Sequence, residues 1–119
     1  PKDEDEFVDM LWTMTNHDSG PIAVRYPRGA GPGVKPKENP EIIDIGKAEI
    51  IKSGSDVGLI GLGHLFEMAE KTCSKLEEKG HSVSLINPRF IKPIDSSAMI
   101  EMAERVKVIC TFEDHVLHN

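Results

Sequence analysis

Apolar residues in the first part of the chain recur at helical spacing. Between residues 3 and 16 they fall at Phe7, Met10, Leu11 and Met14, which is the i, i+3, i+4, i+7 stripe of an amphipathic helix. Carboxylates occupy the first turn, where the positive end of the helix dipole favours negative charge. The pattern therefore predicts a surface helix with one buried face.

The pattern changes after this helix. A turn signal at residues 17–20 precedes Pro21–Tyr26, a short and mostly apolar segment that predicts a buried strand. Residues 29–40 are then dense in glycine and proline, which is typical of a linker that runs over a surface. We expect a domain boundary in this linker, because one helix and one strand cannot form a core by themselves.

The remainder of the chain alternates strands and helices. The predicted elements are an edge strand over 41–52 interrupted at Gly46, a strand over 57–62, a helix over 65–79, a strand over 82–87, a helix over 96–105 and a strand over 106–112. Asp95 stands where an N-cap is needed, and Gly80 stands where a left-handed residue ends a helix. This alternation predicts an α/β fold with a mostly parallel sheet, right-handed crossovers and helices on both faces.

Composition and charge narrow the class of protein. The formal net charge is −6 and the acidic residues are spread along the chain, which disfavours nucleic acid and anionic membranes as partners. No apolar run approaches the ~20 residues of a membrane helix, and the first residues are acidic where a signal peptide would be basic. We expect a cytoplasmic protein.

The spacing of Cys73 and Cys110 predicts no disulfide framework or zinc site, so we expect both to be reduced packing residues.

One candidate anion site follows the first predicted strand, in the run Arg25-Tyr26-Pro27-Arg28-Gly29. Open α/β sheets place ligands at the carboxyl ends of their strands. Pro27 fixes its φ angle and Gly29 frees the backbone, so the chain leaves the sheet abruptly with Arg28 at the exit. A guanidinium there suits a phosphate, because it donates two parallel charge-assisted hydrogen bonds. Residue types alone nevertheless favour a structural role for both arginines.

The run Gly61-Leu62-Gly63-His64 invites comparison with a dinucleotide-binding fingerprint. The comparison fails at Phe66, where a third glycine is required, and no acidic residue ends the next strand. A tight turn between strand and helix is the favoured interpretation. A contact of His64 with an anion or a partner is the alternative.

The connection over residues 87–95 carries two prolines and two cations. Such a rigid loop fits an interface. It fits equally well a loop in which Phe90 and Ile91 cover the sheet edge while Arg89 and Lys92 are solvated.

Near the end of the chain, His115 and His118 follow Glu113 and Asp114. Their spacing is too irregular for the three or four supported ligands of a zinc site, so no metal site is predicted.

Several ordered motifs together resemble one family. They are Pro1–Glu6 with Met10-Leu11, Gly20–Gly29, Ile45-Gly46-Lys47, Gly54–Val57, Leu62-Gly63-His64, Asn87–Asp95 and Glu113–Leu117. In this order they resemble the 1-deoxy-D-xylulose-5-phosphate synthases, which are transketolase-like thiamine-diphosphate enzymes, over essentially the whole chain. The resemblance implies that residues 1–30 end a pyrimidine-binding domain, residues 31–41 are the linker, and residues 42–119 begin the C-terminal domain.

The resemblance also implies an activity. A homodimeric transferase would use thiamine diphosphate and Mg²⁺ to condense pyruvate with glyceraldehyde 3-phosphate, releasing CO₂ and giving 1-deoxy-D-xylulose 5-phosphate for isoprenoid, thiamine and pyridoxal synthesis. By position, Arg28 matches the arginine that holds the phosphate of the aldehyde acceptor, and Tyr26 with Arg25 supports that loop. No residue is assigned to catalysis, cofactor or metal.

The chain itself is expected to be a fragment. It begins at Pro1 without an initiator methionine and stops directly after a strand-like segment. The resemblance implies that the cofactor-binding groups precede Pro1, so we expect the missing N-terminal part to be a partner, no cofactor to bind this chain, and the chain alone to be inactive. At position 88 the family more often has a small residue, whereas this chain has Pro88. This departure puts little of the resemblance in doubt.

Two other classes of protein remain open. The chain could belong to another transketolase-like enzyme, such as a transketolase or a 2-oxo acid dehydrogenase β subunit. It could instead be a non-enzymatic α/β module that binds a partner or a small anion. The run Pro27-Arg28-Gly29 and the loop over 89–95 favour the synthase.

Overall fold

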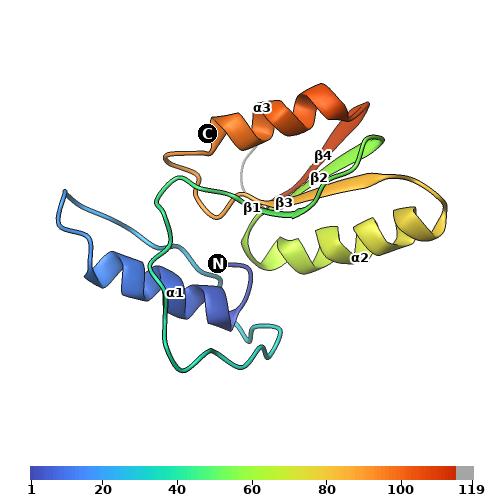
Figure 1. Ribbon diagram of the computed structural model, residues 1–119. Helices are drawn as coiled ribbons and strands as arrows, with labels where there is room; N and C mark the ends of the chain where they lie inside the picture. Colours follow the sequence, from blue (N-terminus) through green and yellow to red (C-terminus); the bar gives the residue numbers. More distant parts are fainter. Residues whose placement is uncertain (115–119) are drawn as a thin grey trace.

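The computed structural model describes residues 1–114. In chain order these residues form α1 (Glu4–Thr15), β1 (Glu49–Lys52), β2 (Val57–Gly61), a 3₁₀ turn η1 (Gly63–Leu65), α2 (Phe66–Glu78), β3 (Val83–Asn87), α3 (Ser96–Arg105) and β4 (Val108–Phe112) (Figure 1). None of the helices in this described part has the length and apolarity needed to cross a bilayer.

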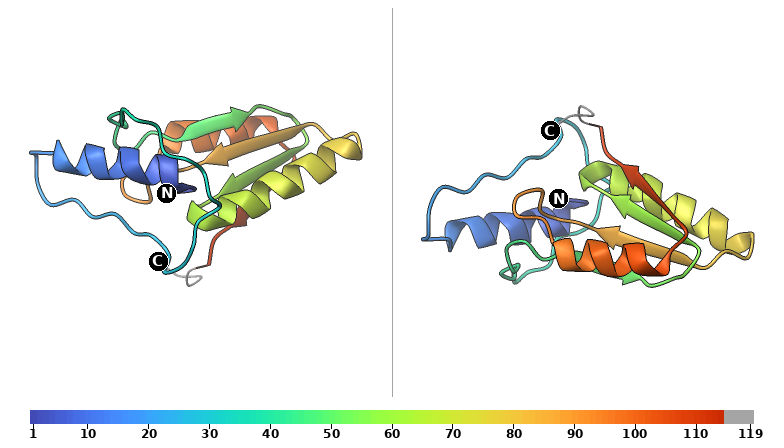
Figure 2. Two further views of the ribbon diagram at one scale, coloured as in Figure 1. Left: turned by 90° about the horizontal axis from the view of Figure 1, so that it is seen from below. Right: turned by 90° about the horizontal axis from the view of Figure 1, so that it is seen from above.

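The strands form one four-stranded sheet in the order β1-β3-β2-β4. β2 pairs in parallel with β3 and with β4, whereas β1 runs antiparallel to β3. Helix α2 covers one face of the sheet and α3 covers the other, as the two views in Figure 2 show from opposite sides. The predicted α/β class, with a mostly parallel sheet between helices, is therefore confirmed.

The core lies mainly between the sheet and α2. Its buried members are Leu59, Phe66, Ala69, Cys73, Val83 and Leu85. On the opposite face, the buried side chain of Met102 in α3 packs against β2 at Gly58. A Cβ atom on residue 58 would lie only 2.9 Å from the Met102 sulfur. Glycine at this position lets α3 approach the sheet closely.

The helix predicted over 3–16 forms, as do the strands and helices predicted from residue 57 onward, with bounds that differ by at most two residues. The strand predicted over Pro21–Tyr26 does not form. A strand needs a neighbour for its backbone hydrogen bonds, and no segment of residues 1–114 pairs with this one. The edge strand predicted over 41–52 is confined to β1, because Gly46 adopts φ +79° in a turn.

The two cysteines differ in environment. Cys73 is buried in the core as predicted, but Cys110 is exposed. The prediction that both are packing residues is therefore wrong for Cys110. The reason is that β4 is an edge strand of the sheet in the described residues, and its side chains are largely uncovered.

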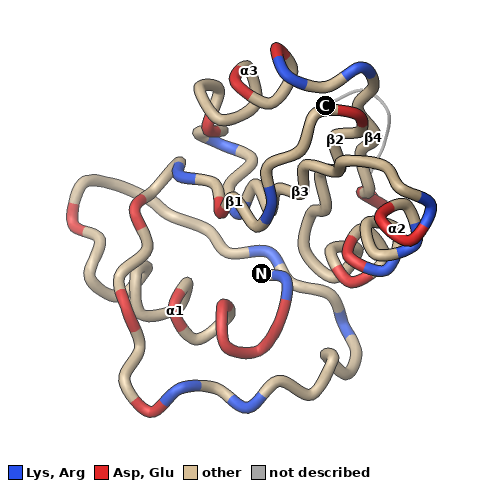
Figure 3. Tube along the Cα trace, turned by 45° about the vertical axis from the view of Figure 1, so that its right-hand side comes forward, with Lys and Arg blue, Asp and Glu red and all other residues tan. Residues whose placement is uncertain are grey.

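Helix α1 lies beside the sheet rather than over either of its faces (Figures 1 and 3). Its acidic side chains accept hydrogen bonds from the linker. Asp9 accepts hydrogen bonds from the Glu41 amide at 2.7 Å and from Lys37 Nζ at 2.8 Å. One turn later, Thr13 Oγ1 accepts from the Ile43 amide at 2.8 Å. The polar side chains of α1 therefore accept hydrogen bonds from backbone amides of the linker and of the residues just after it, which have no regular structure of their own.

Asp95 caps α3 as predicted. Its buried carboxylate accepts hydrogen bonds from Ser97 Oγ at 2.6 Å, the Ala48 amide at 3.2 Å and the Ala98 amide at 3.2 Å, and Lys47 Nζ lies 3.7 Å away. These three hydrogen bonds, with a smaller effect of the Lys47 charge, lower the pKa of Asp95 from 3.8 to about 2.

This pKa predicts a specific sensitivity to acid. Because the pKa is lower in the folded state than the ordinary 3.8, Asp95 stabilises the fold above that value, and its contribution is lost as the pH falls towards 2. We expect the urea midpoint of the parent to fall more between pH 4 and pH 2 than that of Asp95→Asn. Glu38→Gln, which changes an exposed carboxylate, should behave like the parent. Equal losses in parent and Asp95→Asn would contradict this prediction.

Candidate functional site

A cavity of about 720 Å³ lies between α1, the segment over 21–27 and the sheet. From the sheet it is lined by Leu62–His64 after β2, Arg89–Pro93 after β3 and Asp114 after β4. All three segments follow the carboxyl ends of parallel strands. This is the edge at which open α/β sheets bind ligands, so the cavity is the candidate functional cleft.

The opposite wall of the cleft is largely apolar. It consists of Met10 and Met14 of α1, with Ile22 and Val24 of the extended segment. Ile22 and Val24 are half-buried, whereas the residues on either side of them are exposed. The cleft therefore combines an apolar wall with a sheet edge that carries cations and a carboxylate.

Asp114 is the carboxylate of this edge. It lies 3.7 Å from Arg25 Nη2 and 3.6 Å from His64 Nε2. All three side chains are about half exposed, and exposed pairs of this kind contribute little to stability, about 0–1 kcal/mol. Arg25 thus forms an exposed ion pair with a carboxylate. The 3₁₀ turn η1 is the tight turn expected between β2 and α2.

The two predicted substrate residues are held differently. The ring of Tyr26 lines the cleft and contacts the Phe7 ring, with centroids 4.8 Å apart, although the residue is 61% exposed. Arg28 is exposed, does not line the cleft, and pairs with no carboxylate of residues 1–114. The strand exit that would hold its guanidinium is absent from this part of the chain. The phosphate role of Arg28 stays a prediction.

A partly buried polar network joins α1 to the sheet. We define the Glu6 network as Lys2, Glu6, Glu49, Asn87 and Arg89. Glu6 Oε1 accepts from Asn87 Nδ2 at 2.7 Å and from Arg89 Nε at 2.9 Å. Glu49 pairs with Lys2, accepts from Asn87 Nδ2 at 3.1 Å and lies 3.5 Å from Arg89 Nη2. The sequence interpretation assigned no role to Glu6, Glu49 or Asn87.

The network corrects the interpretation of the loop over 87–95. Arg89 is not solvated, because it pairs with Glu6, whereas Lys92 is exposed. Burial raises the pKa of Glu49, but hydrogen bonds from Lys2 and Asn87 and the nearby charges outweigh burial and leave that pKa below its ordinary value. The loop is therefore an interface with α1. Its two prolines and two cations were the only sequence signal for it.

Within residues 1–114, no group of three or more His, Cys, Asp or Glu side chains converges in an arrangement that could hold a metal ion. His115 and His118, which were weighed as ligands, lie outside the described residues.

The sheet between two helices, with a cleft at its carboxyl edge, places the chain among the open α/β domains that bind ligands at this edge. The pattern of the family described as "Transketolase, C-terminal domain" matches residues 46–118, and the chain belongs to this family. Within it, the sequence resembles a section of 1-deoxy-D-xylulose-5-phosphate synthase. It is 53% identical to the synthase of Methylacidiphilum infernorum and 48% identical to that of Acidobacterium capsulatum, each over 117 residues. These comparisons confirm the resemblance of the motifs.

Both matches cover 98% of this chain but only 18% of the relative, so the chain spans less than a fifth of the synthases it matches. Among solved structures, a "Split gene transketolase, inactive beta4 tetramer" superposes with a TM-score of 0.59 over 76% of this chain and 28% of that chain. Its sequence is 24% identical, so this likeness supports the fold alone.

Proposed function

We propose that this chain is part of a 1-deoxy-D-xylulose-5-phosphate synthase, a transferase that condenses pyruvate with glyceraldehyde 3-phosphate and releases CO₂. The observation that carries the proposal is the 53% identity through 98% of the chain. Domain boundaries at 30 and 41, a homodimer, a cytoplasmic location and a product used for isoprenoid, thiamine and pyridoxal synthesis belong to the same proposal.

Within this proposal, Arg28 binds the phosphate of the aldehyde acceptor. Two observations support the assignment. Its guanidinium is exposed and pairs with no carboxylate of the described residues, so binding a phosphate breaks no ion pair seen there. Tyr26, two residues before Arg28, packs on Phe7 of α1 and so supports the segment that carries Arg28.

Thiamine diphosphate and Mg²⁺ would supply the carbanion chemistry when bound to the whole enzyme. Residues 1–114 offer no converging metal ligands, so Mg²⁺ does not fit this part of the chain. We assign thiamine diphosphate and Mg²⁺ to the rest of the enzyme, and expect that the chain alone does not turn over.

A chimera tests the proposed function. The section of the Methylacidiphilum infernorum synthase that matches this chain is replaced by the chain, and formation of 1-deoxy-D-xylulose 5-phosphate from the two substrates is measured. We expect an active chimera, because about half of the exchanged positions are identical. A second chimera carrying the equivalent section of a transketolase serves as the control and should lose this activity. A folded first chimera that binds thiamine diphosphate yet forms no product would contradict the proposal.

A further inference from the structure

The Glu6 carboxylate is only 4% exposed and lies where α1 meets the sheet. A buried carboxylate is costly unless charged and polar partners surround it. Besides Asn87 and Arg89, Glu6 accepts a hydrogen bond from the Lys2 amide at 2.6 Å. Because these partners come from the start of the chain and from the end of β3, Glu6 cannot move away from the sheet without losing them. The network therefore determines where α1 lies.

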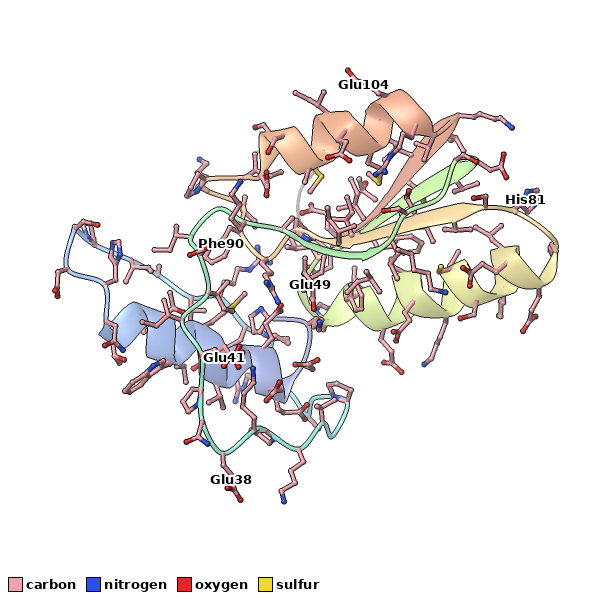
Figure 4. All side chains as sticks on the ribbon, viewed as in Figure 1. Glu38, Glu41, Glu49, His81, Phe90 and Glu104 are labelled. Carbon is pink, nitrogen blue, oxygen red and sulfur yellow. The ribbon has the colours of Figure 1, made fainter. Side chains whose placement is uncertain are left out.

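Arg89 is held in an unusual backbone conformation. Its φ is +57°, and among residues 1–114 it is the only residue other than glycine with a positive φ. L-residues rarely adopt this conformation, and it persists where surrounding contacts impose it, often at functional sites. The conformation is supported by the Arg89 amide, which donates to Asn87 Oδ1 at 3.2 Å. The guanidinium meets two carboxylates, Glu6 of α1 and Glu49. Glu49, labelled in Figure 4, is the first residue of β1.

The network is linked by contacts to the segment that carries Arg28. Glu6 is followed by Phe7, whose ring packs on Tyr26, and Arg28 is two residues beyond Tyr26. The other described anchor of this segment to the sheet edge is the exposed pair of Arg25 and Asp114. Since exposed pairs hold weakly, the Glu6 network, in which Glu6 and Asn87 are buried, provides the stronger restraint on the segment.

We propose that Arg89 is a positioning residue that acts through Glu6 to hold α1, Tyr26 and the Arg28 segment against the carboxyl edge of the sheet. The effect on substrate binding rests on the proposed function, because Arg28 must bind the acceptor phosphate. The effect on the position of the segment does not, since it follows from the contacts of the network alone.

The test uses the active chimera with Arg89→Met, which removes the charge but keeps much of the side-chain length, and with Arg89→Lys, which restores a charge. Arg105→Met, at the exposed end of α3, is the matched control. The rate at which trypsin cleaves the folded chimera after Arg25 and Arg28, followed by mass spectrometry, reports how often the segment leaves the sheet edge. The KM values for glyceraldehyde 3-phosphate and pyruvate, with kcat, report its consequence.

For Arg89→Met we expect cleavage after Arg25 and Arg28 to accelerate about tenfold, as for the loss of one hydrogen bond to a charged group, with cleavage after Lys71 and Lys75 of α2 unchanged. The KM for glyceraldehyde 3-phosphate should rise by a similar factor, with kcat and the KM for pyruvate within about twofold of the parent. Arg89→Lys should recover part of both effects. If Arg89→Met lowers the yield of folded protein, the double variant Glu6→Gln/Arg89→Gln, which leaves no unpaired buried charge, should show the same changes.

Unchanged cleavage after Arg25 and Arg28 in Arg89→Met would overturn the positioning role. So would an equal acceleration of cleavage in α2, which is the sign of a merely structural residue. Faster cleavage with an unchanged KM for glyceraldehyde 3-phosphate would overturn the link to Arg28. A chimera that is inactive before any substitution refutes the proposed function instead, and the cleavage measurement still decides the positioning role.

Discussion

Replacing Arg28 by alanine in an active synthase that carries this chain should raise the apparent KM for glyceraldehyde 3-phosphate by about 10- to 100-fold, as for the loss of a charge-assisted hydrogen bond. The KM for pyruvate should change little, because pyruvate has no phosphate for the guanidinium to bind. Initial rates with one substrate varied at a time give both constants. Arg28→Lys should be intermediate, since an ammonium keeps the charge but cannot form the two parallel hydrogen bonds of the guanidinium.

The control for Arg28 is Arg105→Ala. Arg105 is also an exposed arginine, and it pairs with Glu101 on the same helix at 3.6 Å, remote from the cleft. Its removal should leave both KM values unchanged. If Arg28→Ala raises the two KM values equally, the guanidinium does not distinguish the substrates and the phosphate assignment fails.

The largest effect on stability is expected for Leu59→Ala. Leu59 is 1% exposed in β2, which lies between β3 and β4, and it packs in the core beneath α2. Truncation removes apolar burial and leaves a cavity that a sheet paired on both sides cannot readily close, so the free energy of unfolding should fall by about 3–5 kcal/mol. Urea unfolding followed by circular dichroism measures this change.

Ile100→Ala is the matched control for Leu59→Ala. Ile100 is a β-branched residue of similar size, but it is exposed on α3, so its loss should change the free energy of unfolding by less than about 0.5 kcal/mol. Similar losses for the two variants would show that the packing between the sheet and α2 does not dominate the stability of the chain.

Local patterns were sufficient to predict most of the elements. The 3.6-residue spacing of apolar positions marks α1, and the cap at Asp95 and the left-handed Gly80 bound α3 and α2. The reason is that helix formation and capping depend on residues within a few positions of one another. Apolar strands between helices likewise predict a parallel sheet, because both of its faces must be covered.

Pairing between strands could not be predicted in the same way. The apolar run over 21–26 has the composition of a strand, but a strand also needs a partner, and residues 1–114 provide none. Similarly, only the last four residues of the segment over 41–52 pair with β3. Composition describes the segment alone, whereas hydrogen bonding in a sheet depends on what lies beside it.

For the site, the sequence alone determined the chemistry of single residues and the family. It identified Arg28 as a guanidinium suited to a phosphate, and the ordered motifs led to the synthases. Only the tertiary structure decided that Arg89 meets Glu6 across 83 positions of sequence and that Asn87 reaches the same carboxylate across 81. Contacts between residues so far apart leave no periodic trace in the sequence, since they arise only when the end of β3 and the first turn of α1 are brought together by the packing of the chain.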